Sequence, residues 1–251
     1  MKELMDGLAY LDAIDHQLIK KAYAYASIAH EHQSRRTGEP YIHHPVAVAK
    51  TLAGLHLDKE SIAAGLLHDV LEDTALSTDF IAKEFGVEIL SLVDGVSKLD
   101  QIEYEDTNQA QAENFSKMML AMVKDIRVIL IKLADRVHNI QTLNALEQKK
   151  QFKIARETLQ IYAPIANRLG IYQMKTLLER EAFRYAYPYR HKILKRALKR
   201  KVGNQKRTLK TITGRIRRNL NKSSLSAEIQ SREKALFSIY NKMKNKNLSF
   251  D

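Results

Sequence analysis

Four side chains able to bind a metal crowd one short stretch of the chain, HDVLEDT at 68–74. They are His68, Asp69, Glu72 and Asp73, and they follow an apolar run, IAAGLL, that is typical of a buried helix. Because residues four apart share a helical face, the first two of these side chains are expected to stand above the last two. Carboxylates are unfavourable at the C-terminal end of a helix, so a bound cation would stabilise this group. The alternative is a solvated acidic helix end with a partly buried histidine, since His-Asp alone is a common pair.

A second candidate is a polar stripe in the apolar segment IKLADRVHNIQTL. Asp135, Asn139 and Thr142 fall at i, i+4 and i+7, which places them on one side of a helix. Such a stripe lines a pocket or binds water. The alternative is that Asp135 only pairs with a basic neighbour such as Lys132 or Arg136.

A third contributor is the segment YIHHP, in which His43 and His44 precede Pro45 and are biased toward an extended backbone. Two histidines and two aspartates give a mixed nitrogen and oxygen set that suits Mn, Fe, Co, Ni or Zn, and the carboxylates favour the harder ions. Spacing does not tell which of the two histidines would bind. The others have no partner pattern and are interpreted as structural or surface histidines: His30, His32, His56 and His138.

Helical periodicity dominates the segments that must position these side chains, so an all-α fold is predicted. Helices are expected over 45–55, 59–72, 78–85, 87–95, 108–123, 126–145 and 150–168. The β-branched run at 126–134 could form a buried strand, but its continuation favours a long buried helix. A short strand is expected at 225–229, before a basic amphipathic helix.

Composition narrows the chemistry. The chain has no cysteine, which excludes disulfides, thiolate metal sites and cysteine nucleophiles, so any metal must be held by His, Asp, Glu or water. No apolar run approaches the roughly 20 residues of a membrane helix, and the N-terminus lacks a signal-peptide pattern. No membrane association is therefore expected, and the cytoplasm is the predicted location.

Charge divides the chain into two parts. Residues 1–150 hold 16 Lys and Arg against 23 Asp and Glu, a net charge of −7. Residues 151–251 hold 25 against 6, a net charge of +19, so the two parts account for the +12 of the whole chain. An acidic first part suits a cation site, and a basic second part suits phosphate, nucleotide or nucleic acid.

Several motifs in the same order resemble the hydrolase domain of the RelA/SpoT family, most closely its bifunctional SpoT type. They include RRTGEPYIHHPVAVA, AAGLLHDVLEDT, FGVEILSLVDGVSKLD and IARETLQIYAPIANRLGI, and the similarity spans about residues 18–187. The resemblance implies an HD-type helical bundle over 1–187. It also implies a basic helical linker and the beginning of an α/β synthetase domain over 188–251.

The resemblance further implies one Mn(II) ion and removal of the 3′-pyrophosphate of ppGpp or pppGpp, giving GDP or GTP. Carried over by position, the metal ligands are His44, His68, Asp69 and Asp135. The general-base and proton-handling pair beside the attacking water is Glu72 and Asp73. Nucleotide contacts fall on Arg35, Arg36 and Thr37 in one loop, where Thr37 stands at a place often held by Ser, and on Asn139 and Thr142. Read without the resemblance, the two arginines are solvated loop charges or groups that grip phosphate and stack on a purine.

The tail SREKALFSIYNKM resembles the opening of the family's synthetase domain. Arg232, Lys234 and Lys242 match positions that would meet ATP phosphates, while Ser231 stands where the family usually has Gly. The residues that synthesis requires would lie beyond Asp251, so no pyrophosphate transfer is expected from this chain.

Two other hypotheses stay open. One is an HD phosphohydrolase that acts on another nucleotide with a 3′ or 2′ phosphate. The other is a noncatalytic module in which the basic part docks on RNA, the ribosome or an acidic partner. A basic surface alone does not separate them, because phosphate contacts and nonspecific nucleic-acid attraction have the same cause.

Overall fold

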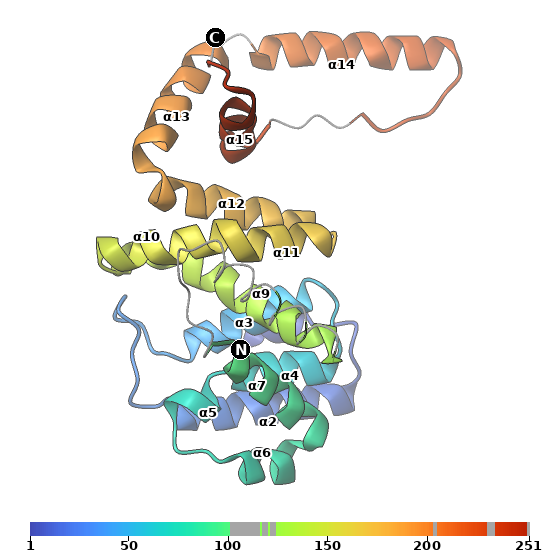
Figure 1. Ribbon diagram of the computed structural model, residues 1–251. Helices are drawn as coiled ribbons and strands as arrows, with labels where there is room; N and C mark the ends of the chain where they lie inside the picture. The colour runs from blue at the N-terminus through green and yellow to red at the C-terminus, as the bar shows by residue number, and fades with distance from the viewer. Residues whose placement is uncertain (101–115, 117–119, 121–123, 203–204, 230–233, 250–251) are drawn as a thin grey trace. The chain divides into compact units, whose positions relative to one another are not determined.

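The structure is a computed structural model that describes residues 1–100, 116, 120, 124–202, 205–229 and 234–249. Every regular element in these ranges is a helix, which confirms the all-α prediction (Figure 1). The chain divides into two compact units, Met1–Leu178 and Glu179–Asp251. The assignment of a hydrolase to one part and a synthetase fragment to the other stays a prediction.

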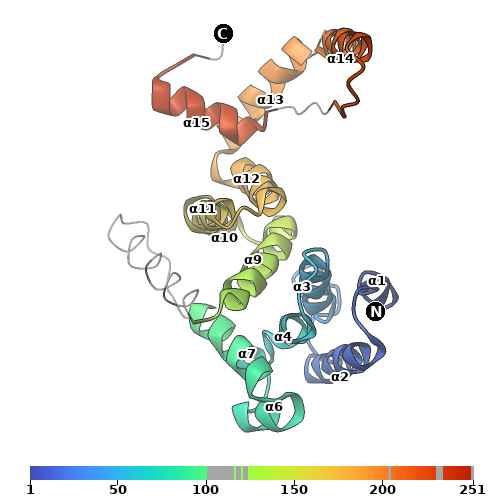
Figure 2. The ribbon, with the colours of Figure 1, turned by 90° about the vertical axis from the view of Figure 1, so that its right-hand side faces the viewer.

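The first unit is a bundle built around one apolar helix. Its elements are α1 Lys2–Asp6, α2 Ala13–Ala29, α3 His43–Ala53, α4 Lys59–Leu67, α5 Val70–Asp73, α6 Thr78–Phe85, α7 Val87–Asp100, α9 Ile126–Gln141, a 3-10 turn Leu143–Ala145, α10 Gln148–Glu157, a π-helical turn Thr158–Tyr162 and α11 Ala163–Arg168. Helix α4 packs against α2, α3 and α7, and α9 packs against α3 and α7 (Figure 2). Residues 61–67 of α4 are all buried, because no polar face is needed on a helix that neighbours enclose.

Two glycines let these helices approach closely. A Cβ added to Gly65 of α4 would lie 2.5 Å from Cδ1 of Leu52 on α3. A Cβ added to Gly95 of α7 would lie 2.8 Å from Cγ2 of Val128 on α9. The close approach of α4 to α3 therefore requires a glycine at position 65, and that of α7 to α9 requires a glycine at position 95.

Arg127 joins the beginnings of three helices. Asp58 and Asp125 cap α4 and α9, accepting from the backbone N–H of Ser61 and Arg127. The Arg127 guanidinium lies 3.1 Å from Asp58 and 2.7 Å from Asp125, and it also lies 2.8 Å from Glu88 in the first turn of α7. The N-terminal ends of α4, α7 and α9 are thus tied together, and two of these helices, α4 and α9, lead to the candidate site.

The segment around His68 departs from the predicted helix over 59–72. Helix α4 ends at Leu67, and Asp69 is the N-cap residue of the separate short helix α5. Glu72 and Asp73 are the last two residues of this four-residue helix, so the acidic residues follow the end of α4 in a separate single turn. His68 and Asp69, at the break, keep helical backbone angles.

Three other local predictions need correction. His43 and His44 are the first residues of α3, so the expected extended backbone was wrong. The bias before proline is overridden because Pro45 lies in the first turn, where its missing N–H has no intrahelical partner to lose. Residues 225–229 form no strand, since no described segment pairs with them. The helix expected at 126–145 is α9 followed by a 3-10 turn, and the helix expected at 108–123 falls mostly outside the described residues.

The second unit is held by an aromatic cluster. Helix α12, Tyr172–Ala186, ends in this unit and is followed by α13 Pro188–Val202, α14 Gln205–Lys222 and α15 Leu236–Lys246. The ring of Phe183 lies 5.4 Å from Phe237 and 5.2 Å from Tyr240, and Tyr187 lies 5.1 Å from Tyr240. In the described part of the chain, no helix is long and apolar enough to cross a membrane.

The Gly95 contact predicts a specific energetic coupling. Gly95→Ala is expected to lower the free energy of unfolding by about 1–3 kcal/mol, because the new methyl group overlaps Val128. In a Val128→Ala background the same substitution is expected to cost almost nothing, which a urea-unfolding double-mutant cycle measures. The control is Gly214→Ala on α14, where an added Cβ meets no described atom within 4 Å. Equal costs of Gly95→Ala in both backgrounds would contradict the close-approach explanation.

Candidate metal centre

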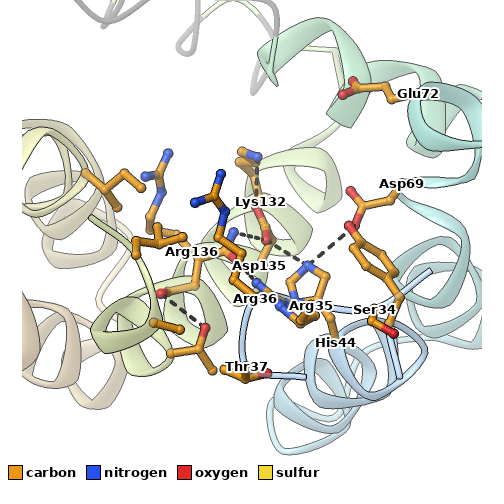
Figure 3. Close-up of a pocket in the computed structure, with 16 residues that line it drawn as sticks. Ser34, Arg35, Arg36, Thr37, His44, Asp69, Glu72, Lys132, Asp135 and Arg136 are labelled. Atoms are coloured by element: carbon orange, nitrogen blue, oxygen red, sulfur yellow. Dashed lines mark hydrogen bonds and ion pairs between the residues drawn. The ribbon is translucent and has the colours of Figure 1, made fainter. Parts of the chain in front are cut away.

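The predicted site residues converge on one cavity of about 460 Å³ in the first unit (Figure 3). Nine of the eleven line it: Arg35, Arg36, Thr37, His44, Asp69, Glu72, Asp135, Asn139 and Thr142. The other two lie beside it. His68 is buried behind Asp69, and Asp73 contacts the Tyr41 hydroxyl. The cavity thus draws on the loop before α3, on α3 itself, on the α4–α5 break and on α9.

Two histidines and an aspartate form a compact cluster. Ligand atoms of His44, His68 and Asp135 all lie within 4.8 Å of one another. Nε2 of His44 is 3.2 Å from Oδ1 of Asp135, and Nε2 of His68 is 3.9 Å from the same oxygen. Asp69, the fourth predicted ligand, places its two oxygens 3.0 Å from His68 and 3.5 Å from His44.

The orientation of His68 points to a cation. Its Nδ1 lies 3.0 Å from the carbonyl of Gly65, which can only accept, so Nδ1 carries the hydrogen. Nε2 is then a lone pair that faces carboxylate oxygens, and this atom is buried with no hydrogen-bond partner among the described residues. Buried acceptors that face each other are costly, and a divalent metal ion would satisfy them. The residues present therefore fit a metal.

Asp135 is the most buried acid of the cluster and divides its two oxygens between different partners. Oδ2 receives the ammonium of Lys132 at 2.7 Å, and Oδ1 faces His44 and accepts from Asn139 Nδ2 at 2.5 Å. Burial acts to raise the pKa of Asp135, but Lys132 and the two histidines hold this pKa well below its ordinary value. The sequence also allowed Asp135 to pair with a basic neighbour, and the pair with Lys132 is present. It involves Oδ2, while Oδ1 faces the histidines.

The structure separates the two adjacent histidines. His44 is 2% exposed and points into the cluster, whereas His43 is exposed. Burial lowers the pKa of His44, which favours the neutral ring that a metal requires. The choice that spacing left open between them is therefore made by the packing of α3 against α9.

Glu72 and Asp73 occupy different places. Glu72 is exposed and lines the cavity, and it lies apart from His44 and Asp135 in Figure 3. Asp73 accepts from the Tyr41 hydroxyl at 3.1 Å, and the same hydroxyl donates to Asp69 at 2.6 Å. Burial and these two carboxylates raise the pKa of Tyr41, so it stays a hydrogen-bond donor. Tyr41 thus orients Asp69, a contact that its position three residues before His44 could have indicated.

The loop before α3 is held against α9 by Arg35. Its guanidinium donates to Oδ1 of Asn139 at 2.8 Å and lies 3.2 Å from Nδ1 of His138. The loop turns at Gly38, whose φ of 86° suits glycine, and Gly38 N–H donates to the Arg35 carbonyl at 2.8 Å. His138, for which the sequence predicts a structural or surface role, is partly buried and lies against His44. Its spacing of three from Asp135 on one helix was the available signal.

Four cationic side chains face the cavity: Arg35, Arg36, Lys132 and Arg136. Arg136 is buried, pairs with Glu157 at 3.0 Å and lies 4.2 Å from the centre of the Tyr162 ring. Glu157 immediately precedes the π-helical turn, and Tyr162 is the last residue of that turn. A cavity with this charge beside a candidate metal cluster suits a polyanionic ligand such as a phosphate ester.

Comparison with known proteins places this architecture in a family. A model of the HD domain matches residues 22–172. The chain belongs to the HD-domain family. It is 51% identical over 241 residues to the guanosine-3′,5′-bis(diphosphate) 3′-pyrophosphohydrolase of Vibrio cholerae, covering 96% of this chain and 34% of that protein. It is 49% identical to the bifunctional (p)ppGpp synthase/hydrolase SpoT of Escherichia coli, covering 93% and 33%.

A solved structure extends the likeness to this HD domain. It is described as a metazoan ortholog of SpoT that hydrolyzes ppGpp, and it matches with a TM-score of 0.52 and 26% identity. The match covers 70% of this chain and 97% of the other. By contrast, the chain spans about a third of the length of the bacterial relatives.

Lys132 is expected to stabilise the metal-free site. In Lys132→Met, the buried Asp135 carboxylate loses the ammonium that lies 2.7 Å from it, and the free energy of unfolding in chelator is expected to fall by about 3–5 kcal/mol. A divalent cation should stabilise this variant more than the unmodified chain, because it replaces the missing charge. Lys98→Met, which removes an exposed pair with Asp94, is the control and is expected to change stability by less than about 1 kcal/mol. A Lys132→Met variant of unchanged stability in chelator would contradict the assignment.

His138 predicts a pH dependence of stability. Burial, His44 and Arg35 lower the pKa of His138 to about 4, whereas an unfolded histidine titrates near 6.5. Between these values the unfolded chain binds a proton that the folded chain does not, so stability is expected to fall as the pH drops from 6.5 toward 4. Unfolding of the metal-free protein at a series of pH values measures this slope. His138→Asn, which cannot titrate, should show a shallower slope, and identical slopes would refute the prediction.

Proposed function

We propose that the chain is a metal-dependent phosphohydrolase that removes the 3′-pyrophosphate of ppGpp or pppGpp, with Mn(II) as its ion. The observation that carries the proposal is the buried cluster of His44, His68 and Asp135 at the floor of a cavity lined by cations. The names of the bacterial relatives and the description of the metazoan structure favour this substrate.

The metal would be held by His44, His68, Asp69 and Asp135. A bound divalent cation lowers the pKa of water and neutralises charge that gathers on phosphoryl oxygens, which a polyanionic ester needs for attack at neutral pH. The nitrogen and oxygen donors without thiolate suit Mn(II). The buried Nε2 of His68 supports this set, because it faces carboxylate oxygens of Asp69 and Asp135.

The remaining residues bind the substrate and handle protons. Glu72 is the exposed carboxylate at the cavity, so it is the better placed general base, while Asp73 acts through Tyr41 on the orientation of Asp69. Arg35, Arg36 and Thr37 would contact the nucleotide from the loop before α3. Asn139 and Thr142 would contact its ribose and phosphate side from α9.

The test is pyrophosphate release from ppGpp by the purified chain with added Mn(II) and with chelator. Release is expected only with the metal, and Asp69→Asn and Glu72→Gln are each expected to lower kcat by about 10²- to 10⁴-fold. Asp79→Asn, an exposed acid in the first turn of α6, is the matched control and should keep the rate. Turnover that survives chelator or Asp69→Asn would refute the proposal.

The same assays separate the competing hypotheses. A panel of nucleotides with 3′ or 2′ phosphates tests whether another substrate is preferred. The binding-module hypothesis would gain if Asp69→Ala left turnover unchanged and removal of 191–251 abolished all measurable function. Incubation with ATP and GTP tests the expected lack of pyrophosphate transfer, and the cytoplasmic location stays a prediction.

A further inference from the structure

The two histidines of the cluster hold their Nδ1 atoms in different ways. Nδ1 of His68 donates to a backbone carbonyl, which fixes the tautomer without help from any side chain. Nδ1 of His44 lies 2.8 Å from Nδ1 of His138, with the two ring centres 4.9 Å apart. A neutral histidine nitrogen can donate or accept, so this contact alone leaves open which ring carries the hydrogen.

Arg35 removes that ambiguity. Its Nη1 lies 3.2 Å from the same Nδ1 of His138 that faces His44. A guanidinium has donors only and keeps its charge, so Nδ1 of His138 must present its lone pair. The hydrogen in the 2.8 Å contact then belongs to Nδ1 of His44, because two acceptors would repel there. His44 is left with its lone pair on Nε2, 3.2 Å from Asp135.

We propose that His138 is a positioning residue of the metal centre, which together with Arg35 holds His44 in the tautomer whose Nε2 binds the cation. The proposal rests on the metal site of the proposed function and not on its substrate. Groups that hold the second nitrogen of a metal-binding histidine fix its ring orientation and raise its basicity. His44 is 2% exposed, so water has little access to take over this role.

The relay joins three separate segments of the chain. Arg35 comes from the loop before α3, His44 from the first turn of α3 and His138 from the last turn of α9. The contacts span 94 residues between the histidines and 103 between Arg35 and His138. A loop arginine expected to hold the nucleotide therefore also influences the metal ligand, and it does so through His138 and not by direct contact with His44.

The tautomers can be measured directly in the full chain loaded with Zn(II), a diamagnetic ion that suits the same nitrogen and oxygen donors and satisfies the facing acceptors of His44 and Asp135. In ¹⁵N-histidine spectra near neutral pH, His44 is expected to carry its hydrogen on Nδ1 and His138 on Nε2. In Arg35→Met, the His138 signals should move toward a mixture of tautomers, because the donor that selects one is gone. A hydrogen on Nδ1 of His138 in the unmodified chain would overturn the proposal.

Metal affinity provides the second measurement, by titration with Mn(II) alone. His138→Leu removes the acceptor and is expected to weaken binding by about 10- to 100-fold. His138→Asn, whose Oδ1 can accept from Nδ1 of His44, should recover most of this loss, and His32→Leu at an exposed position should bind as the unmodified chain does. Unchanged affinity in His138→Leu, or equal loss in the Leu and Asn variants, would overturn the relay.

Circular dichroism in chelator establishes that each variant is folded. If His138→Leu does not fold, the proposal is tested by the spectra of the unmodified chain and by the Mn(II) affinity of His138→Asn. A loss of affinity of about 10-fold or more in His138→Asn would then contradict the proposal. None of these measurements uses ppGpp. Intact metal binding and the expected tautomers without hydrolysis would refute the proposed function and leave this inference standing.

Discussion

A single buried carboxylate organises the site. Asp135 is 3% exposed; Lys132 donates to one of its oxygens and Asn139 to the other, and this second oxygen also faces the two histidines. A charge so buried is stable only when its neighbours supply compensating charge and hydrogen bonds. The positions of α3, the end of α4 and α9 are therefore constrained together, because each helix contributes a partner of this one group.

The bundle meets that constraint through close packing. Gly65 and Gly95 remove the side chains that would separate α4 from α3 and α7 from α9. Arg127 joins the N-terminal ends of α4, α7 and α9 through the carboxylates of Asp58, Glu88 and Asp125. The glycine contacts and the Arg127 ion pairs lie outside the cavity. The cavity lining can therefore carry polar groups that would be costly in an ordinary core.

The break between α4 and α5 solves a geometric problem. A continuous helix through His68 and Asp69 would have run on in the buried direction of α4. Ending at Leu67 leaves His68 anchored to Gly65 while Asp69 turns toward both histidines and accepts from Tyr41. Acidic residues then follow in the single turn of α5, of which Glu72 and Asp73 are the last two residues.

Much about this protein follows from local sequence: an all-helical fold, an oxygen and nitrogen metal site in a chain without cysteine, and a polar stripe on α9. These are properties of residue type and of spacing within one element, which periodicity reports directly. Tertiary structure alone decided that His44 and not His43 enters the cluster, that Asp135 faces the histidines as well as Lys132, and that Tyr41 and His138 join the site. The contact between His44 and His138 links residues 94 positions apart, and it depends on how helices pack, which no local pattern encodes.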